Sequence, residues 1–441
     1  MLEGFVRERF ADHCIIRLPG LFGLHLRKNY IYDMLQGNNT AAINRNSAFQ
    51  WYDLSRLAGD IETVLRLGLR DVNLFPEPLP TERLITAVAD AGAIAGGTAA
   101  ADVGHAGAFA EYNVCTRHGP QLGGPEGGRY CASAGEVCAQ LGRLLAEWSM
   151  MARTTVSCIA WDEASNEGAL ELLKLQGARY IEVAPTRFWE WEVLESAHAG
   201  GTLGKLVAGL AADLARWGLQ VSSLQAVLYK KPDLLLFGSA EARAQLGAHM
   251  RLVVNLVCTL RDAGIVRPGG AVPIVFGAPK NRQRPAGMLE EEADAIFVDV
   301  FAPLARYAAD RDCVICVEPN APDYGCNYIT TSGDAKRLVE RVGHPGLRVH
   351  LDTGCMTMAG EDLEAGFKAC AGLIGHVHVS EPFLANYLEP KVDHARAARA
   401  LRAIGYDKLV SLELLTKDLG QLAGSLAFYQ QTYLPLFSTA Q

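Results

Sequence analysis

From residue 153 onward the chain alternates strand-like and helix-like segments with unusual regularity. The strand-like segments read TTVSCIAW, ARYIEVAP, LQVSSLQAVL, AVPIVFGAP, CVICVEP, LRVHLDT, IGHVHVSEP and KLVSLEL, and a helical stretch follows each of them. Repeated strand–helix units predict a parallel sheet with right-handed crossovers. Eight such units fit a closed (β/α)8 barrel, or TIM barrel, better than an open sheet. We therefore predict an α/β barrel over residues 153–441.

Residues 1–150 do not continue this pattern. WYDLSRLAGDIETVLRLGLRDVNLFPEP predicts a helix that runs into a strand, ERLITAVADAGAIAGGTAAADVG predicts another helix–strand unit, and ASAGEVCAQLGRLLAEWSMM predicts a third helix. This α/β segment is too short to close a barrel of its own. We predict two domains, a partial α/β domain over 1–150 and the barrel over 153–441, with the first docked on the second or on another subunit.

Four of the expected strands end on residue types that bind metal ions. These residues are Glu318, Asp352, His378 and Glu413, each about one strand–helix unit from the next. A buried strand has no apolar reason to carry an acid, and the carboxyl ends of barrel strands share the face where barrel enzymes keep their chemistry. Their convergence predicts a mostly oxygen-ligand site for a divalent cation. Taken singly, each is also compatible with an ordinary polar strand end, and His376, on the same strand and face as His378, is an alternative ligand.

Composition narrows the class of protein. A formal charge of −8 and a pI of about 5.8 argue against a nucleic-acid-binding surface. No uninterrupted apolar stretch is long enough to cross a membrane, and the charged N-terminus lacks the apolar core of a signal peptide. The 11 cysteines are scattered without paired spacings, which favours reduced thiols. We expect a cytoplasmic protein with a small-molecule substrate and with neither nucleic acid nor membrane as partner.

The motifs VEPN, LDTG, HVHVSEP and SLELL within 153–441 together resemble those of the xylose isomerase-like TIM barrel superfamily, which contains sugar phosphate isomerases and epimerases. The resemblance implies that one divalent ion (Mn²⁺, Mg²⁺, Co²⁺ or Zn²⁺) is held by Glu318, Asp352, His378 and Glu413. It implies that Glu318 and Glu413 are also the catalytic acid and base. The ion would polarise a carbonyl group while the glutamates move the neighbouring proton.

The same resemblance implies an isomerase or epimerase of a small polyhydroxylated carbonyl compound, which is a sugar, a sugar phosphate or a sugar acid. Two alternatives stay open: a dehydratase (lyase) of a keto-polyol, and a catalytically silent barrel that serves as a binding or scaffold protein. The same four residues permit all of these.

Departures from the family pattern narrow the substrate. The endonuclease branch for abasic sites needs a histidine shortly after the aspartate, whereas Asp352 is followed here by Thr353, Gly354 and Cys355. Several ketose epimerases also place a substrate-contacting histidine there and an arginine a few residues beyond the ligand histidine, and HVHVSEPF lacks it. We therefore expect neither DNA repair nor turnover of a free ketohexose.

Further polar residues near strand ends are candidates for substrate binding: Lys280, Asn281, Arg282, Glu182, Gln225, Glu381 and Asn320. Lys280, Asn281 and Arg282 follow the fourth strand, where they suit a phosphate or carboxylate group. The alternative there is a solvated basic loop. Glu182 and Gln225 lie near the ends of the second and third strands, where they either bind substrate hydroxyls or close a layer of the barrel.

Within residues 1–150, SRLAGDIETVLRLGLRDVNLFP and CTRHG resemble the N-terminal half of porphobilinogen synthase. The catalytic lysines of that family belong to its second half, so the resemblance does not imply porphobilinogen synthesis. We expect a docking, lid or oligomerisation role for this segment, with a degenerate relic as the alternative. A homo-oligomer is left open.

Overall fold

The computed structural model describes residues 2–23, 26, 28–91, 100–104, 106–126 and 128–437. The chain forms two compact units, Met1–Ser149 and Met150–Gln441. No helix among the described residues is both long enough and apolar enough to span a membrane.

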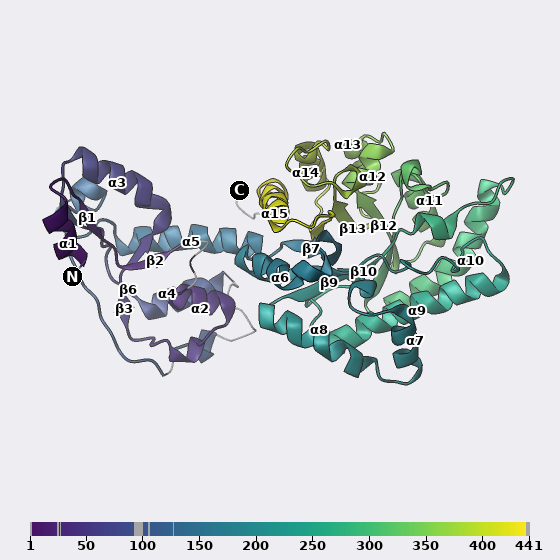
Figure 1. Ribbon diagram of the computed structural model, residues 1–441, viewed down its shortest axis with the longest axis horizontal. Coiled ribbons are helices and arrows are strands. Elements are labelled where there is room, and N and C mark those ends of the chain that lie inside the picture. Colours follow the sequence, from purple (N-terminus) through teal and green to yellow (C-terminus); the bar gives the residue numbers. More distant parts are fainter. Residues whose placement is uncertain are drawn as a thin grey trace. The chain divides into compact units, whose positions relative to one another are not determined.

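The second unit is a closed barrel of eight parallel strands, which confirms the predicted (β/α)8 TIM barrel fold (Figure 1). The strands are β7 (Thr155–Ser157), β8 (Tyr180–Val183), β9 (Gln220–Leu224), β10 (Val272–Phe276), β11 (Cys313–Val317), β12 (Leu347–Asp352), β13 (Ile374–Val379) and β14 (Val410–Leu412). Each strand pairs in parallel with the next along the chain, and β14 closes the ring by pairing with β7. Consecutive order and parallel pairing follow from the strand–helix repeat, because each crossover returns the chain to the same end of the sheet.

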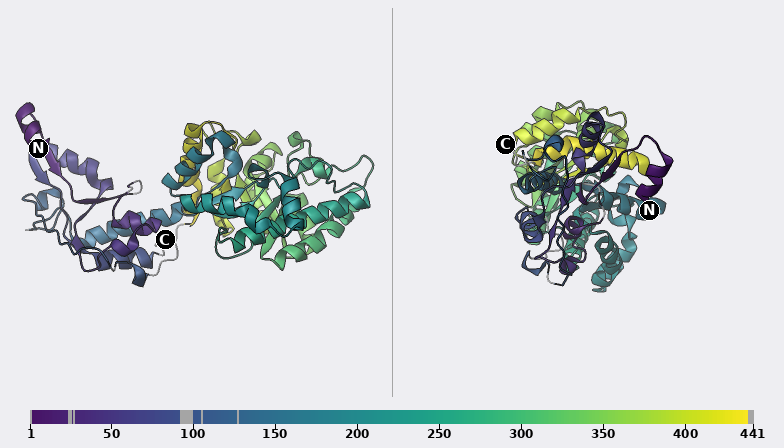
Figure 2. Two further views of the ribbon diagram at one scale, coloured as in Figure 1. Left: turned by 60° about the horizontal axis from the view of Figure 1, so that its bottom comes forward. Right: turned by 90° about the vertical axis from the view of Figure 1, so that its left-hand side faces the viewer.

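Helices connect the strands and cover the outside of the barrel (Figures 1 and 2). They are α6 (Asn166–Leu175), α7 (Trp191–Ala199), α8 (Leu203–Trp217), α9 (Ala240–Asp262), α10 (Glu290–Ala309), α11 (Ser332–Val342), α12 (Thr353–Met358), α13 (Leu363–Ala369), α14 (His394–Ala403) and α15 (Leu419–Tyr433). Helix α11 illustrates their local signals: the Thr331 side chain accepts a hydrogen bond from the backbone N–H of Asp334 at its start. At its end, Gly343 has φ 61°, a left-handed conformation that glycine adopts at little cost. The space between strands and helices holds one large apolar core that includes Ile181, Val257 and Phe297.

The first unit combines short strands with helices, in line with the predicted additional α/β segment. Strands β1 (Ile15–Arg17) and β5 (Asp71–Asn73) pair in parallel, as do β2 (Gly20–Phe22) and β4 (Trp51–Asp53), whereas β3 (Ala48–Phe49) and β6 (Leu79–Pro80) are antiparallel. The helices are α1 (Leu2–Arg9), α2 (Tyr30–Gln36), α3 (Leu57–Arg66), α4 (Thr81–Asp90) and α5 (Ala134–Met151). The predicted helix–strand unit of residues 82–104 includes residues 92–99, and those eight residues lie outside the described residues. The resemblance of this unit to porphobilinogen synthase stays a prediction.

Candidate active site

Four polar side chains lie at the carboxyl ends of four consecutive barrel strands. Glu318 directly follows β11, Asp352 is the last residue of β12, His378 lies one residue before the end of β13, and Glu413 directly follows β14. Asp352 and His378 are register partners across the β12–β13 pair. Since the strands are parallel neighbours, all four residues belong to one rim, the mouth of the barrel.

The side chains of this quartet meet in space. One ligand atom each of Glu318, Asp352 and His378 lies within 4.8 Å of the other two. The Nδ1 atom of His378 is 3.1 Å from the Oε2 atom of Glu413. The structure therefore brings together the four residues that the sequence singles out, and their roles as ligands remain predictions.

The quartet has the properties of a cation site. Asp352 is buried, and its Oδ1 atom accepts hydrogen bonds from the Cys355 N–H and the Ser380 hydroxyl, whereas Oδ2 has no hydrogen-bond partner. A buried, unpaired carboxylate oxygen is costly unless something else satisfies it. Both ring nitrogens of His378 lie near carboxylates without the geometry of a hydrogen bond. These donors fit a divalent cation that accepts carboxylate and imidazole ligands.

The carboxyl groups of Glu318 and Asp352 hold their protons more strongly than ordinary acids. Burial raises the pKa of Glu318 to about 8. Burial and the nearby Glu413 carboxylate raise the pKa of Asp352 to about 6. Removing water disfavours the charged form, and neighbouring negative charges add to that effect. A bound cation would reverse both influences.

Glu182, for which substrate contact and a place in a barrel layer were both left open, is fully buried next to the quartet. Its Oε2 atom is 2.7 Å from Nε2 of His378, and its Oε1 atom accepts a 2.8 Å hydrogen bond from Nε2 of His376. The hydroxyls of Ser223 and Ser411 donate to the same carboxylate. With all these protein partners, Glu182 fits the alternative of a residue that closes a barrel layer, where it orients the two histidines.

The Glu182–His378 pair fixes how the histidine faces the mouth. Burial by itself would lower the pKa of His378, but the carboxylates of Glu182 and Glu413 raise that pKa well above its usual value. Burial would raise the pKa of Glu182, but the two histidines hold it well below its usual value. Because Nε2 of His378 is turned toward Glu182, Nδ1 is the nitrogen that faces Glu413 and the mouth.

Gln225 supports the last residue of the quartet. Its side-chain amide donates to the Ser157 hydroxyl at 2.6 Å and to Oε1 of Glu413 at 2.8 Å. That leaves Oε2 of Glu413 on the side of His378. Gln225 therefore contacts the quartet through Glu413, and substrate binding by its side chain stays a prediction.

Two of the three residues proposed as an anion clamp after β10, Asn281 and Arg282, donate to main-chain carbonyls instead. Arg282 is fully buried, and its guanidinium donates to the carbonyl groups of Phe276, Gly277, Glu318 and Tyr328. The Asn281 amide donates to the carbonyls of Lys231 and Leu234, and Lys280 is exposed. The correction has a physical reason: main-chain carbonyls saturate the N–H groups that an anion would need.

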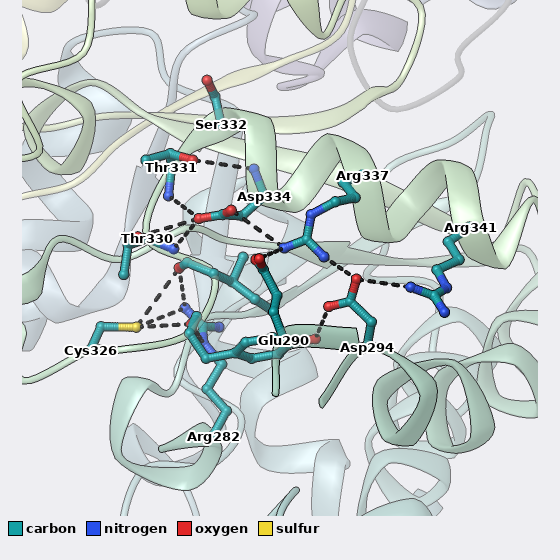
Figure 3. A network of polar contacts seen from close by, with 12 residues as sticks. Arg282, Glu290, Asp294, Cys326, Thr330, Thr331, Ser332, Asp334, Arg337 and Arg341 are labelled. Carbon is teal, nitrogen blue, oxygen red and sulfur yellow. Dashed lines mark hydrogen bonds and ion pairs between the residues drawn. The ribbon is translucent and has the colours of Figure 1, made fainter. Parts of the chain in front are cut away.

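Arg282 is part of a larger network that holds the loop between β11 and α11 (Figure 3). Asp334 accepts from the N–H groups of Thr330 and Thr331, and Arg337 joins Asp334 to Asp294. This loop begins at Glu318, so the network fixes the residue from which the first carboxylate of the quartet projects.

Two further candidates also prove to be supports. Glu381 is buried and turned away from the mouth, where it accepts from the Lys391 N–H and lies 2.7 Å from Nε2 of His394. Asn320 accepts a 2.7 Å hydrogen bond from Arg282. These protein partners give both side chains a part in holding the loops of the mouth, and substrate contact by either stays a prediction.

One buried residue near the quartet was not identified from the sequence. His350, two residues before Asp352 on β12, is fully buried, and its Nε2 atom is 3.9 Å from Oε1 of Glu318. The available signal was the two-residue spacing, because alternate residues of a strand share one face.

At the rim, the rings of Tyr324 and Phe383 meet with centroids 5.9 Å apart, on the loops after β11 and β13.

Comparisons with known proteins agree with this architecture. The model of the xylose isomerase-like TIM barrel family matches residues 170–431. A curated relative, L-ribulose 3-epimerase of Mesorhizobium japonicum, is 28% identical over 93 residues, which are 21% of this chain and 31% of that protein. The match thus spans about a third of the relative's length.

Solved structures resemble the barrel unit in fold. A D-psicose 3-epimerase structure obtained in the presence of D-fructose has a TM-score of 0.50 at 17% identity, covering 63% of this chain and 98% of that one. A 3-keto-D-glucoside 4-epimerase from E. coli has a TM-score of 0.48 at 17% identity, covering 64% and 99%. At 17% identity, the likeness to the D-psicose 3-epimerase shows the fold alone.

Proposed function

This chain belongs to the xylose isomerase-like TIM barrel family, and from that premise we propose that it isomerises or epimerises a small polyhydroxylated carbonyl compound. The substrate class is a sugar, a sugar phosphate or a sugar acid. The reaction moves a proton on the carbon next to the carbonyl. Glu318, Asp352, His378 and Glu413 hold one divalent cation that the reaction requires.

The single observation that carries the proposal is the meeting of three carboxylates and one imidazole at the mouth of the barrel. Asp352 has one buried oxygen without a partner, which supports a ligand role rather than a structural one. The relatives that are epimerases support the reaction class.

The residues divide the work between binding and proton transfer. A divalent cation, when bound, polarises the carbonyl group and offsets negative charge on its oxygen. Glu318 and Glu413 act as the acid–base pair that removes the neighbouring proton and returns it. In the metal-free protein burial raises the pKa of Glu318 to about 8, and a bound cation would lower that pKa and leave Glu318 as a carboxylate able to accept a proton. Gln225 keeps Glu413 in position through a 2.8 Å hydrogen bond.

The test is proton exchange with solvent, which reports the first step without knowledge of the product. The full chain, supplied with Mn²⁺, is incubated in D₂O with a panel of ketoses, ketose phosphates and keto-acids, and mass spectrometry follows deuterium uptake next to the carbonyl. We expect uptake with at least one member of the panel. Glu413→Gln should slow it by roughly 10²–10⁴-fold, because it removes an acid–base group.

The matched control is Glu389→Gln, an exposed glutamate in the loop after β13, which should leave uptake unchanged. Uptake of equal rate in Glu413→Gln and the native chain would contradict the acid–base role. A product that absorbs as a conjugated enone would identify the dehydratase alternative instead. No uptake and no new product across the panel would reject the enzymatic proposal.

A further inference from the structure

Three histidines lie together inside the barrel, beneath the quartet. His350 comes from β12, and His376 and His378 come from β13. All three are buried, with 0–2% of their surface exposed. The ring centroid of His350 is 4.3 Å from that of His378 and 5.4 Å from that of His376. Barrel interiors are normally filled by branched apolar side chains, so a cluster of three imidazoles needs a reason.

His350 is the member of this cluster with the least support from the protein. Neither of its ring nitrogens has a hydrogen-bond partner among the described residues. The nearest carboxylate oxygen, Oε1 of Glu318, is 3.9 Å from Nε2, which is beyond hydrogen-bond distance. Leaving a buried polar nitrogen unpaired costs free energy, and native structures rarely do so without a ligand, a water or a function.

The geometry points to a second metal site, and we propose that His350, His376 and His378 bind a divalent transition-metal ion of the Zn²⁺ class. One ring nitrogen of each histidine lies within 4.8 Å of the others. Imidazole ligands suit Zn²⁺, Co²⁺, Ni²⁺ and Cu²⁺, whereas carboxylates suit Mg²⁺ and Mn²⁺. The Glu182 carboxylate, in contact with two of the three histidines, supplies negative charge next to the ion and orients the rings.

His378 belongs to both metal groups, and this couples them. It presents Nδ1 on the side of Glu413 and holds Nε2 2.7 Å from Oε2 of Glu182, so the inner ion binds Nε2 in place of that direct contact. An imidazole that binds two cations has to give up its ring proton, which costs free energy. We therefore expect that Zn²⁺ in the inner site weakens Mn²⁺ binding at the mouth. This inference concerns metal binding alone, so it stands or falls separately from the proposed reaction.

Cobalt distinguishes the two sites by colour. Four-coordinate Co²⁺ with imidazole ligands absorbs visible light strongly, and six-coordinate Co²⁺ with oxygen ligands absorbs weakly. The full chain, stripped with a chelator, is titrated with Co²⁺ and left to equilibrate for hours, since the histidines are enclosed. We expect two ions per chain, one of them strongly absorbing. A single weakly absorbing ion per chain would overturn the proposal.

The variant His350→Asn removes the inner site and leaves every member of the quartet in place. It should bind one Co²⁺ fewer and lose the strong band, while it still binds Mn²⁺, as measured by electron paramagnetic resonance. Retained Mn²⁺ binding also shows that the variant is folded. The matched control is His249→Asn, a buried histidine on α9 whose ring contacts Trp191, and it should keep both ions. If His350→Asn keeps the strong band, the assignment is wrong.

A measurement on the native protein removes the dependence on variants. X-ray absorption at the zinc edge of protein loaded with a single equivalent of Zn²⁺ should show the scattering of about three imidazoles. A shell with at most one imidazole, which is what the quartet alone would give, would overturn the proposal. Asp352→Asn provides the reverse test, because it should lose Mn²⁺ at the mouth and keep the strong Co²⁺ band. Failure of the reaction test with these bands intact would reject the proposed function and leave the inner site standing.

Discussion

Two neighbouring regions of the barrel rim bury charge in opposite ways. Behind the mouth, the guanidinium of Arg282 is fully buried and donates to several main-chain carbonyls. Within the mouth, Asp352 is also buried, but one of its oxygens has no partner, and burial raises the pKa of Glu318 to about 8. The two regions touch, since Arg282 donates to the carbonyl of Glu318 itself.

The difference separates structural charge from charge kept for a ligand. A buried charge with a full set of hydrogen bonds stabilises the loops around it, and its removal leaves several polar groups unpaired. A buried charge without that set destabilises the free protein and gains its partner only when a ligand binds. Each region therefore responds differently to the loss of its charge.

The largest effect on stability is expected from Arg282→Met. The substitution leaves buried carbonyls without donors and should lower the free energy of unfolding by about 3–5 kcal/mol, as for other broken buried charge networks. Denaturant unfolding of the full chain measures it. Lys280→Met, two residues away and exposed, is the matched control and should change stability by no more than roughly 0.5 kcal/mol. Similar losses in the two variants would erase the contrast between the regions.

In the mouth, loss of charge should raise the free energy of unfolding of the metal-free protein rather than lower it. The pKa of Glu318 is raised to about 8 and that of Asp352 to about 6, each above its value in the unfolded chain. Their favourable contribution is complete below about pH 4 and is lost as the pH rises through 6 and 8. The metal-free protein should therefore lose several degrees of Tm between pH 5 and pH 8.

Thermal unfolding with a chelator, compared with unfolding in Mn²⁺, measures this effect. Mn²⁺ should restore the Tm at pH 8, because the carboxylates then have a partner. Asp352→Asn should unfold at a higher temperature than the native chain in chelator at pH 8, and should gain nothing from Mn²⁺. Two results together would contradict this prediction. They are an equal Tm of the metal-free native chain at pH 5 and pH 8, and an equal Tm of Asp352→Asn and the native chain at pH 8.

The sequence predicts the two regions with unequal success. Glu318, Asp352, His378 and Glu413 each interrupt an apolar strand at its carboxyl end, and a parallel barrel necessarily gathers such positions on one rim. Arg282 follows a strand in the same way, but nothing in GAPKNRQRP distinguishes a guanidinium that faces solvent from one that folds back onto carbonyls. That choice depends on the loop after β11, which is distant in sequence.

His350 and Glu182 mark the other limit of sequence reasoning. His350 shares a strand face with Asp352, so its inward direction could be read from the spacing. Which groups it meets depends on the stagger between β12 and β13, where the register shifts next to His350. Glu182 was an open choice between substrate contact and barrel layer, and only the histidines on β13 decide it.

The smallest effect should come from Gln225, which combines features of the two regions. Its side-chain amide donates two hydrogen bonds within the protein, and one of them supports a residue of the quartet. Gln225→Leu removes the 2.8 Å hydrogen bond to Glu413 and should weaken Mn²⁺ binding by roughly 10–100-fold, as loss of a group that orients a metal ligand does. Calorimetric titration of the chelator-stripped chain measures the affinity, with one Mn²⁺ still bound per chain. Gln225→Glu sharpens the comparison, because it places a further carboxylate beside Glu413 and should raise the affinity for Mn²⁺ above that of Gln225→Leu. Unchanged affinity in both variants would show that Glu413 is held by something other than Gln225, or that it lies outside the metal site.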